Sequence, residues 1–179
     1  MSEVVLFHAA LGPRPGDQVF ADRLRASGHT VHTPDLYDGR TFDSLDEGVA
    51  HGDGLGLAEI GRRAAAAVEP LVPALVYAGF SLGACAAQIL AQRRPGAQGA
   101  LLYHAALPSE PFGGWPAGVP LQIHAMEDDE WFEVDVARAL GGELFLYPGA
   151  GHLFADPDWP DYDEAAAELM IERSLVFLK

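Results

Sequence analysis

A serine, an aspartate and a histidine, which together can hydrolyse an ester, occur in this order along the chain. Ser81 lies in the pentapeptide Gly79-Phe80-Ser81-Leu82-Gly83, which has the form G-x-S-x-G. An acidic run at 127–129 and then His152 follow it. A serine oxygen attacks a carbonyl carbon when an imidazole removes its proton and a carboxylate orients that imidazole. The order Ser, Asp, His therefore predicts a serine nucleophile with its base and its acid.

The glycines around Ser81 have a mechanical reason. The apolar run before Ser81 reads as a strand and the run after it as a helix, so the serine lies on the turn between them. A nucleophile raised on such a tight turn crowds the residues two positions away on each side, where glycine fits. The N–H of Leu82 then points at a developing oxyanion. The alternative is that Ser81 only caps the helix.

The acid and the base follow later strands. His152 ends the segment Tyr147–His152, whose glycines allow the loop to turn the imidazole back over the sheet; a loop histidine without chemistry is the alternative. For the acid we predict Asp128, which lies three residues after the strand end at Ala125. Asp129 is the neighbouring alternative, and Asp135 is a third candidate that is placed to cap the next helix.

Two other kinds of reactive side chain compete with this interpretation. Cys85, the single cysteine, lies one helical turn after Ser81 among small apolar residues, so we expect it to be buried and inert. His8, His104 and His124 lie at or near strand ends, but no ligand pair has the close spacing of a metal site. We therefore expect neither a metal nor an organic cofactor.

Alternating strands and helices must position these residues. The pattern predicts a mostly parallel sheet with helices on both faces, and such sheets bind ligands at the carboxyl ends of their strands. The expected strands are 3–8, 29–33, 75–80, 100–103, 121–125 and 143–147. The expected helices are 17–27, 57–68, 81–93, 134–140 and 164–178. We expect the polar segment 35–56 to be an irregular excursion that lines or covers the site.

Composition and charge limit the classes of function. The 179 residues suit one domain, residues 1–179, with about half of them apolar. The formal charge of −15 disfavours binding to nucleic acid or to anionic membranes. No apolar stretch approaches the length that spans a bilayer, and no signal peptide is evident. The single cysteine fits a reducing cytoplasm, and the oligomeric state is left open.

With these motifs in view, the chain resembles the dienelactone hydrolase family of the α/β-hydrolases. The resemblance runs from Val4 to the C-terminus and rests on PDLYDGR at 34–40, GFSLG at 79–83, MEDD at 126–129 and YPGAGHLFAD at 147–156. It implies a minimal α/β-hydrolase fold with strand order 2-1-3-4-5-6 and no large cap domain. It also implies that the N–H of Ala10 is the second oxyanion donor.

Three departures from that family bear on the substrate. The best-known members use a cysteine nucleophile, where this chain has Ser81, and a glutamate after the first strand, where it has Ala9. These two changes are consistent with each other. The glutamate of those members helps to keep the cysteine thiol quiescent, and a serine nucleophile has no thiol to control. Those members also carry an arginine that grips the substrate carboxylate, and here that position is Asp156. An acidic residue there disfavours an anionic dienelactone.

The sequence therefore predicts a serine hydrolase that cleaves a small-molecule ester or lactone through an acyl-enzyme. The alternatives are a non-catalytic small-molecule binding module on the same fold and an acyltransferase. Aromatic residues in loops near strand ends favour an apolar or aromatic substrate group, with ordinary packing as the alternative: Tyr37, Phe42, Trp115, Trp131 and Phe132. The pocket residues that we expect are His8, Leu11, Tyr37, His104 and Trp131.

Overall fold

A single parallel sheet of six strands organises the chain in the computed structural model, which describes residues 1–179. The strand order is β2-β1-β3-β4-β5-β6, and every neighbouring pair is parallel. This confirms the predicted sheet order and the α/β-hydrolase fold. The strands are β1 Glu3–Phe7, β2 Thr30–His32, β3 Val76–Phe80, β4 Gly99–Tyr103, β5 Leu121–Met126 and β6 Glu143–Tyr147.

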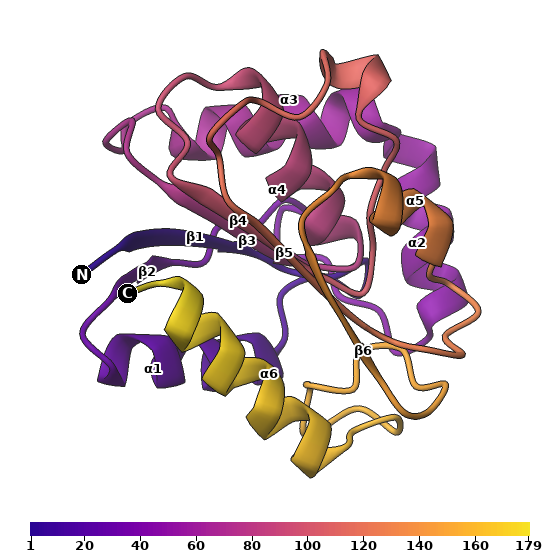
Figure 1. The fold of residues 1–179 in the computed structure, drawn as a ribbon. Helices are drawn as coiled ribbons and strands as arrows, with labels where there is room; N and C mark the ends of the chain where they lie inside the picture. Colours follow the sequence, from indigo (N-terminus) through magenta and orange to yellow (C-terminus); the bar gives the residue numbers. More distant parts are fainter.

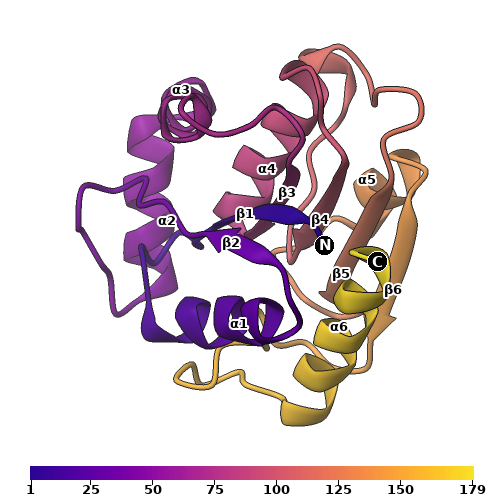
Figure 2. The same ribbon diagram turned by 90° about the vertical axis from the view of Figure 1, so that its left-hand side faces the viewer.

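Helices cover both faces of the sheet (Figures 1 and 2). Helices α1 (Pro15–Ala26) and α6 (Glu164–Phe177) lie on one face. Helices α3 (Leu57–Val68), α4 (Leu82–Arg93) and α5 (Val134–Ala139) lie on the other. Because all strands run the same way, their carboxyl ends meet at one edge, at the right of Figure 1, and the loops that follow them gather there.

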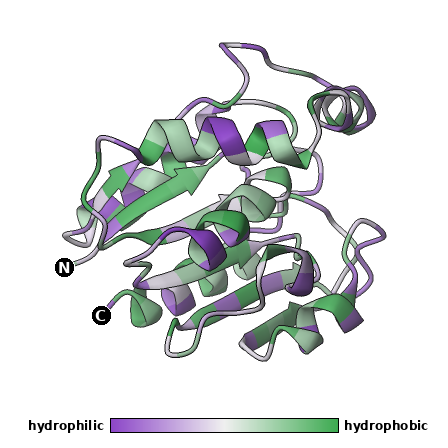
Figure 3. Cartoon of the chain, turned by 90° about the horizontal axis from the view of Figure 1, so that it is seen from above, coloured by the Kyte–Doolittle hydropathy of each residue, from purple (hydrophilic) through white to green (hydrophobic).

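Burial explains why the central strands are continuous apolar runs. All residues of β3, β4 and β5 are buried, because helices lie above and below them. Alternate residues of a strand enter different core clusters: Val76 and Ala78 pack towards α1 and α6, and Tyr77 packs towards α3 and α4. Figure 3 shows the resulting apolar interior strands and the more polar outer helices.

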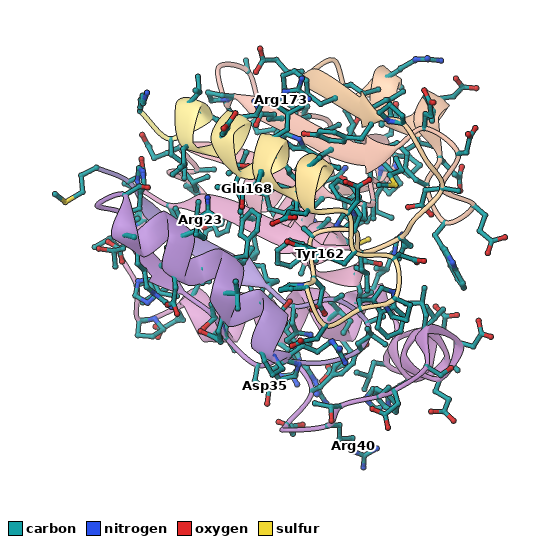
Figure 4. All side chains as sticks on the ribbon, turned by 90° about the horizontal axis from the view of Figure 1, so that it is seen from below. Arg23, Asp35, Arg40, Tyr162, Glu168 and Arg173 are labelled. Atoms are coloured by element: carbon teal, nitrogen blue, oxygen red, sulfur yellow. The ribbon has the colours of Figure 1, made fainter.

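The paired helices α1 and α6 are joined across their surfaces by an ion pair. Arg23 of α1 donates two hydrogen bonds to the carboxylate of Glu168 on α6, at 2.6 and 2.8 Å, and the two side chains meet in Figure 4. Both side chains are nearly half exposed, so the pair adds little stability. No helix is both long enough and apolar enough to cross a bilayer.

The segment 35–56 departs from the sequence-based expectation. It contains helix α2, Leu45–Leu55, where we expected an irregular excursion. Ser44 caps this helix by accepting a hydrogen bond from the N–H of Glu47. The prediction failed because the glycines at 48, 52 and 54 have low helix propensity. Gly48 and Gly52 nevertheless permit close packing that stabilises the helix. A Cβ on Gly48 would lie 2.5 Å from the carbonyl oxygen of Ala10.

The remaining elements agree with the expected ones to within about two residues, apart from a short 3-10 helix at Glu110–Phe112 inside the expected loop 107–120.

Candidate active site

Ser81 occupies a strained turn between β3 and α4. Its φ is +53° and its ψ −114°, a conformation that non-glycine residues rarely adopt and that strained functional turns share. A Cβ on Gly79 would lie 2.1 Å from the carbonyl oxygen of Gly83, so the strand and the helix approach too closely for any side chain there. The two glycines thus permit the turn that lifts Ser81 above the sheet.

The side chain of Ser81 does not cap helix α4. The hydroxyl makes no capping hydrogen bond and instead lies 2.9 Å from Nε2 of His152. Nδ1 of His152 lies 2.7 Å from Oδ2 of Asp129. Since the buried Asp129 carboxylate accepts, Nδ1 carries the proton and Nε2 is left to accept from the serine hydroxyl. A serine, an imidazole and a carboxylate therefore form one hydrogen-bonded series.

The carboxylate in this series is Asp129, which corrects the prediction of Asp128. A tight turn follows β5, in which the N–H of Asp129 donates to the carbonyl of Met126, and the N–H of Asp128 donates to Gly149. This turn directs Asp128 into solvent and Asp129 inward. Asp135, the other alternative, lies on α5 with an almost fully exposed side chain and pairs with Arg138.

Two further contacts hold the loop that carries His152. The N–H of His152 donates to Oδ2 of Asp161 at 3.2 Å, and the N–H of Gly151 lies 3.1 Å from the sulfur of Met126. The second oxygen of Asp129 accepts the N–H of Trp131 at 2.9 Å. Asp161 was not predicted, because nothing in its local sequence distinguishes it from other loop aspartates.

The turn after β1 lies beside the first turn of α4. A Cβ on Gly83 would fall 2.3 Å from the carbonyl oxygen of Phe7 and 2.4 Å from that of His8, so the backbones touch. The N–H of Leu82, at the first position of α4, has no carbonyl partner within the helix. The N–H of Ala10 has no hydrogen bond to another protein group. Two free N–H donors thus belong to adjoining segments next to Ser81.

Four of the five expected pocket residues are buried. Leu11, Tyr37 and His104 have at most 1 % of their surface exposed, and His8 has 4 %. Tyr37 packs edge-on against the rings of His8, Phe42 and His51. Trp131 is the exception, with 42 % exposure and its ring centroid 6.1 Å from that of His152. Among the five, only the indole is available to a ligand at the surface.

His104 is buried without a hydrogen-bond partner for either ring nitrogen. Burial, followed by the nearby His152 and His124, holds its pKa well below the ordinary value, so the ring is neutral. It packs against Phe154 and His152, with centroids 4.8 and 5.6 Å away. The ring also borders a small cavity with room for about one water molecule.

Asp156, which we expected to repel anions, is neutralised by a neighbour. Its Oδ2 accepts a hydrogen bond from Nε of Arg14 at 2.8 Å, and only 10 % of its side chain is exposed. Burial, and then the charge of Asp156, raise the pKa of the adjacent Asp17 to about 7, against the lowering effect of its hydrogen bond from the Arg14 backbone N–H. Asp156 therefore presents no unpaired charge, and it does not disfavour anionic substrates in the way we expected.

The competing reactive groups do not form a second centre. Cys85 is buried, and burial raises the pKa of its thiol to about 12, so the thiol remains protonated and inert as predicted. His124 is held by Tyr147 and Gln122, each 2.8 Å from one ring nitrogen. No group of three or more His, Cys, Asp or Glu side chains is arranged to hold a metal ion.

Comparison with known proteins finds one family and several solved structures of similar fold. The sequence model of the dienelactone hydrolase family matches residues 1–179. No protein of curated function matches the chain. A dienelactone hydrolase-like promiscuous phosphotriesterase from metagenomic libraries is similar in structure, with 21 % identity, a TM-score of 0.79, and coverage of 99 % of this chain and 85 % of that one.

Two further structures show the same fold at low identity. A dienelactone hydrolase from Anabaena variabilis has 19 % identity and a TM-score of 0.68, over 99 % of this chain and 88 % of that one. A cold-adapted esterase from an Arctic intertidal metagenomic library has 16 % identity and a TM-score of 0.66, over 99 % and 83 %.

Proposed function

The chain belongs to the dienelactone hydrolase family, a family of carboxylic ester hydrolases, and we propose that it cleaves an ester or lactone through an acyl-enzyme on Ser81. The observation that carries the proposal is the hydrogen-bonded series from the Ser81 hydroxyl through His152 to the buried carboxylate of Asp129. In this series the imidazole is already in the tautomer that accepts the serine proton.

In the first half-reaction, Oγ of Ser81 attacks the ester carbonyl while Nε2 of His152 takes the hydroxyl proton. Asp129 stabilises the imidazolium that forms and keeps Nδ1 protonated. The tetrahedral intermediate collapses when Nε2 returns this proton to the leaving alcohol, and the C–O bond to the alcohol breaks. The acyl group is then joined to Ser81.

The oxyanion of the intermediate is held by the N–H groups of Leu82 and Ala10. Both donors lack a protein partner at rest, and the contact of Gly83 with the end of β1 places their segments side by side. Each donor of this kind contributes about 10²–10³-fold in rate.

In the second half-reaction, water replaces the alcohol. His152 removes a proton from the water, the hydroxide attacks the acyl carbon, and Ser81 leaves with the proton that His152 returns. The site is compatible with transfer to another acceptor alcohol by the same steps, so product analysis distinguishes hydrolysis from acyl transfer.

The substrate class that fits best is an uncharged ester with an apolar or aromatic group. The exposed indole of Trp131 next to His152 offers an apolar wall for such a group. Arg14 is already paired with Asp156, so it is not free to hold a substrate carboxylate. A neutral phosphotriester is a useful second probe, because one similar structure is a promiscuous phosphotriesterase.

Ser81→Ala tests the mechanism directly. We expect the variant to lose at least about 10³-fold in turnover of 4-nitrophenyl acetate with an unchanged unfolding temperature. A fluorophosphonate should label the wild-type protein once, on Ser81, and leave the variant unlabelled. Full esterase activity in the variant contradicts the mechanism, and a wild-type protein that is neither labelled nor active supports the binding-module alternative.

A further inference from the structure

His8 makes two hydrogen bonds that together determine its tautomer. Its Nδ1 lies 2.7 Å from the carbonyl oxygen of Ala9, and its Nε2 lies 2.9 Å from the backbone N of Leu36. A carbonyl oxygen only accepts and a backbone N–H only donates, so Nδ1 carries the hydrogen and Nε2 accepts. The ring is buried, with 4 % exposure, and lies edge-on to Tyr37. His8 is therefore a fixed neutral donor to Ala9.

The carbonyl of Ala9 and the N–H of Ala10 belong to one peptide unit. That unit is planar and trans, so its C=O and N–H point in opposite directions and turn together. The Ala9 oxygen accepts the bond from His8 and a second one from the N–H of Gly12 at 3.1 Å. Any rotation of the peptide that moved the Ala10 N–H would stretch both bonds.

We infer that His8 is a positioning residue that clamps the Ala9–Ala10 peptide, so that the Ala10 N–H stays aimed at the oxyanion throughout the reaction. The inference rests on the proposed function, in which Ala10 is an oxyanion donor. A donor that is held in place before the charge develops contributes more than one that must reorient. The bond to the carbonyl also polarises the peptide and strengthens its N–H as a donor.

The other end of the clamp is anchored in a separate segment of the chain. Leu36, whose N–H holds Nε2 of His8, follows β2 in a loop that Asp35 organises, and Asp35 is labelled in Figure 4. The carboxylate of Asp35 accepts the N–H of Tyr37 at 2.7 Å and that of Gly39 at 2.5 Å. The loop after β2 thereby fixes the ring of His8, and the ring fixes the turn after β1.

Two conservative substitutions separate the two bonds of His8. Asn places its amide nitrogen near the position of Nδ1, so His8→Asn retains a donor to Ala9 and loses the contact with Leu36. Gln places its amide near Nε2, so His8→Gln retains an acceptor for Leu36 and loses the donor to Ala9. A merely structural role would make the two variants equivalent in turnover.

We expect His8→Gln to lower kcat and kcat/KM for 4-nitrophenyl acetate equally, by about tenfold or more, with KM unchanged. His8→Asn should lose less than about threefold. His124→Gln serves as the matched control: it also removes a buried hydrogen-bonded imidazole, but one that bonds Tyr147 and Gln122 away from the turn, so its kcat should not change.

Unfolding temperatures of the three variants show which of them are folded. Equal kcat values for folded His8→Gln and His8→Asn overturn the inference, and so does a loss in His124→Gln that matches the loss in His8→Gln. If His8→Gln does not fold, His8→Asn decides alone: a fall in kcat above about tenfold contradicts the clamp. Ser81→Ala is measured alongside, because activity without Ser81 contradicts the proposed function, whereas Ser81-dependent activity with equivalent His8 variants contradicts only the role of His8.

Discussion

At the scale of single residues, Asp129 serves two segments at once. One carboxylate oxygen accepts from His152 at 2.7 Å, and the other accepts from the N–H of Trp131 at 2.9 Å. Its side chain is fully buried, so it has no solvent to replace a lost partner. The same carboxylate thus orients the imidazole of His152 and fixes the backbone that carries the exposed indole.

Asp129→Asn and Asp128→Asn form a matched pair on adjacent residues. We expect Asp129→Asn to lower kcat by about 10³–10⁴-fold, because an amide favours the wrong imidazole tautomer and cannot stabilise the imidazolium. Asp128→Asn, at an exposed side chain, should change kcat by less than about twofold. Steady-state kinetics on 4-nitrophenyl acetate measures both, and a greater loss in Asp128→Asn would return the acid to Asp128.

At the scale of elements, glycines decide how closely the helices approach the site. Gly83 allows α4 to touch the end of β1, and Gly48 allows α2 to lie against the carbonyl of Ala10. A third glycine, Gly52, lies against the side chains of Leu82 and Tyr37. Helix α2 therefore supports both segments that carry the proposed oxyanion donors.

Gly48→Ala and Gly54→Ala, in the same helix, separate helix propensity from close packing. Gly54 has no atom within 4 Å of an added Cβ, so its substitution should raise the free energy of unfolding by about 0.5–1 kcal/mol. Gly48→Ala should displace the Ala10 turn and lower kcat by about tenfold or more. Denaturant unfolding and ester kinetics check the pair; equal kcat values would show that α2 does not support the turn.

At the scale of the whole molecule, the net charge of −15 acts on every approaching ligand. Ion pairing does not remove this negative charge, because the chain has 26 acidic residues and only 11 basic ones. An anionic ester meets a repulsive field, which salt screens, while a neutral ester meets none. With Asp156 paired to Arg14, any discrimination against anions comes from this field.

The effect of the net charge can be tested with phenyl acetate and 4-carboxyphenyl acetate. The two esters share the acetyl group and differ in the charge of the alcohol part. From 0.01 M to 1 M salt the Debye length falls from about 30 to 3 Å. We expect kcat/KM for the carboxylated ester to rise by about two- to tenfold over this range. The value for phenyl acetate should stay constant, which controls for salt effects on the enzyme itself. A carboxylated ester that loses activity with salt would instead indicate a cationic binding site.

The sequence predicted the sheet and the turn at Ser81 because both depend on local pattern. Continuous apolar runs between glycines and prolines predicted the buried strands, and the spacing of Gly79, Ser81 and Gly83 predicted the turn that the structure shows. Helix α2 escaped prediction because its stability comes from contacts of Gly48 and Gly52 with distant segments.

The amino-acid sequence alone specifies the order of the elements and the types of residue that follow each strand. The tertiary structure shows which aspartate contacts His152. Asp128 and Asp129 are consecutive residues of the turn after β5, but the side chain of Asp128 is exposed and that of Asp129 is buried. The tertiary structure also shows that Arg14 neutralises Asp156 and that His8 holds the Ala9 carbonyl. These contacts join segments far apart in the chain or depend on how a turn is directed, and local propensity carries no information on either.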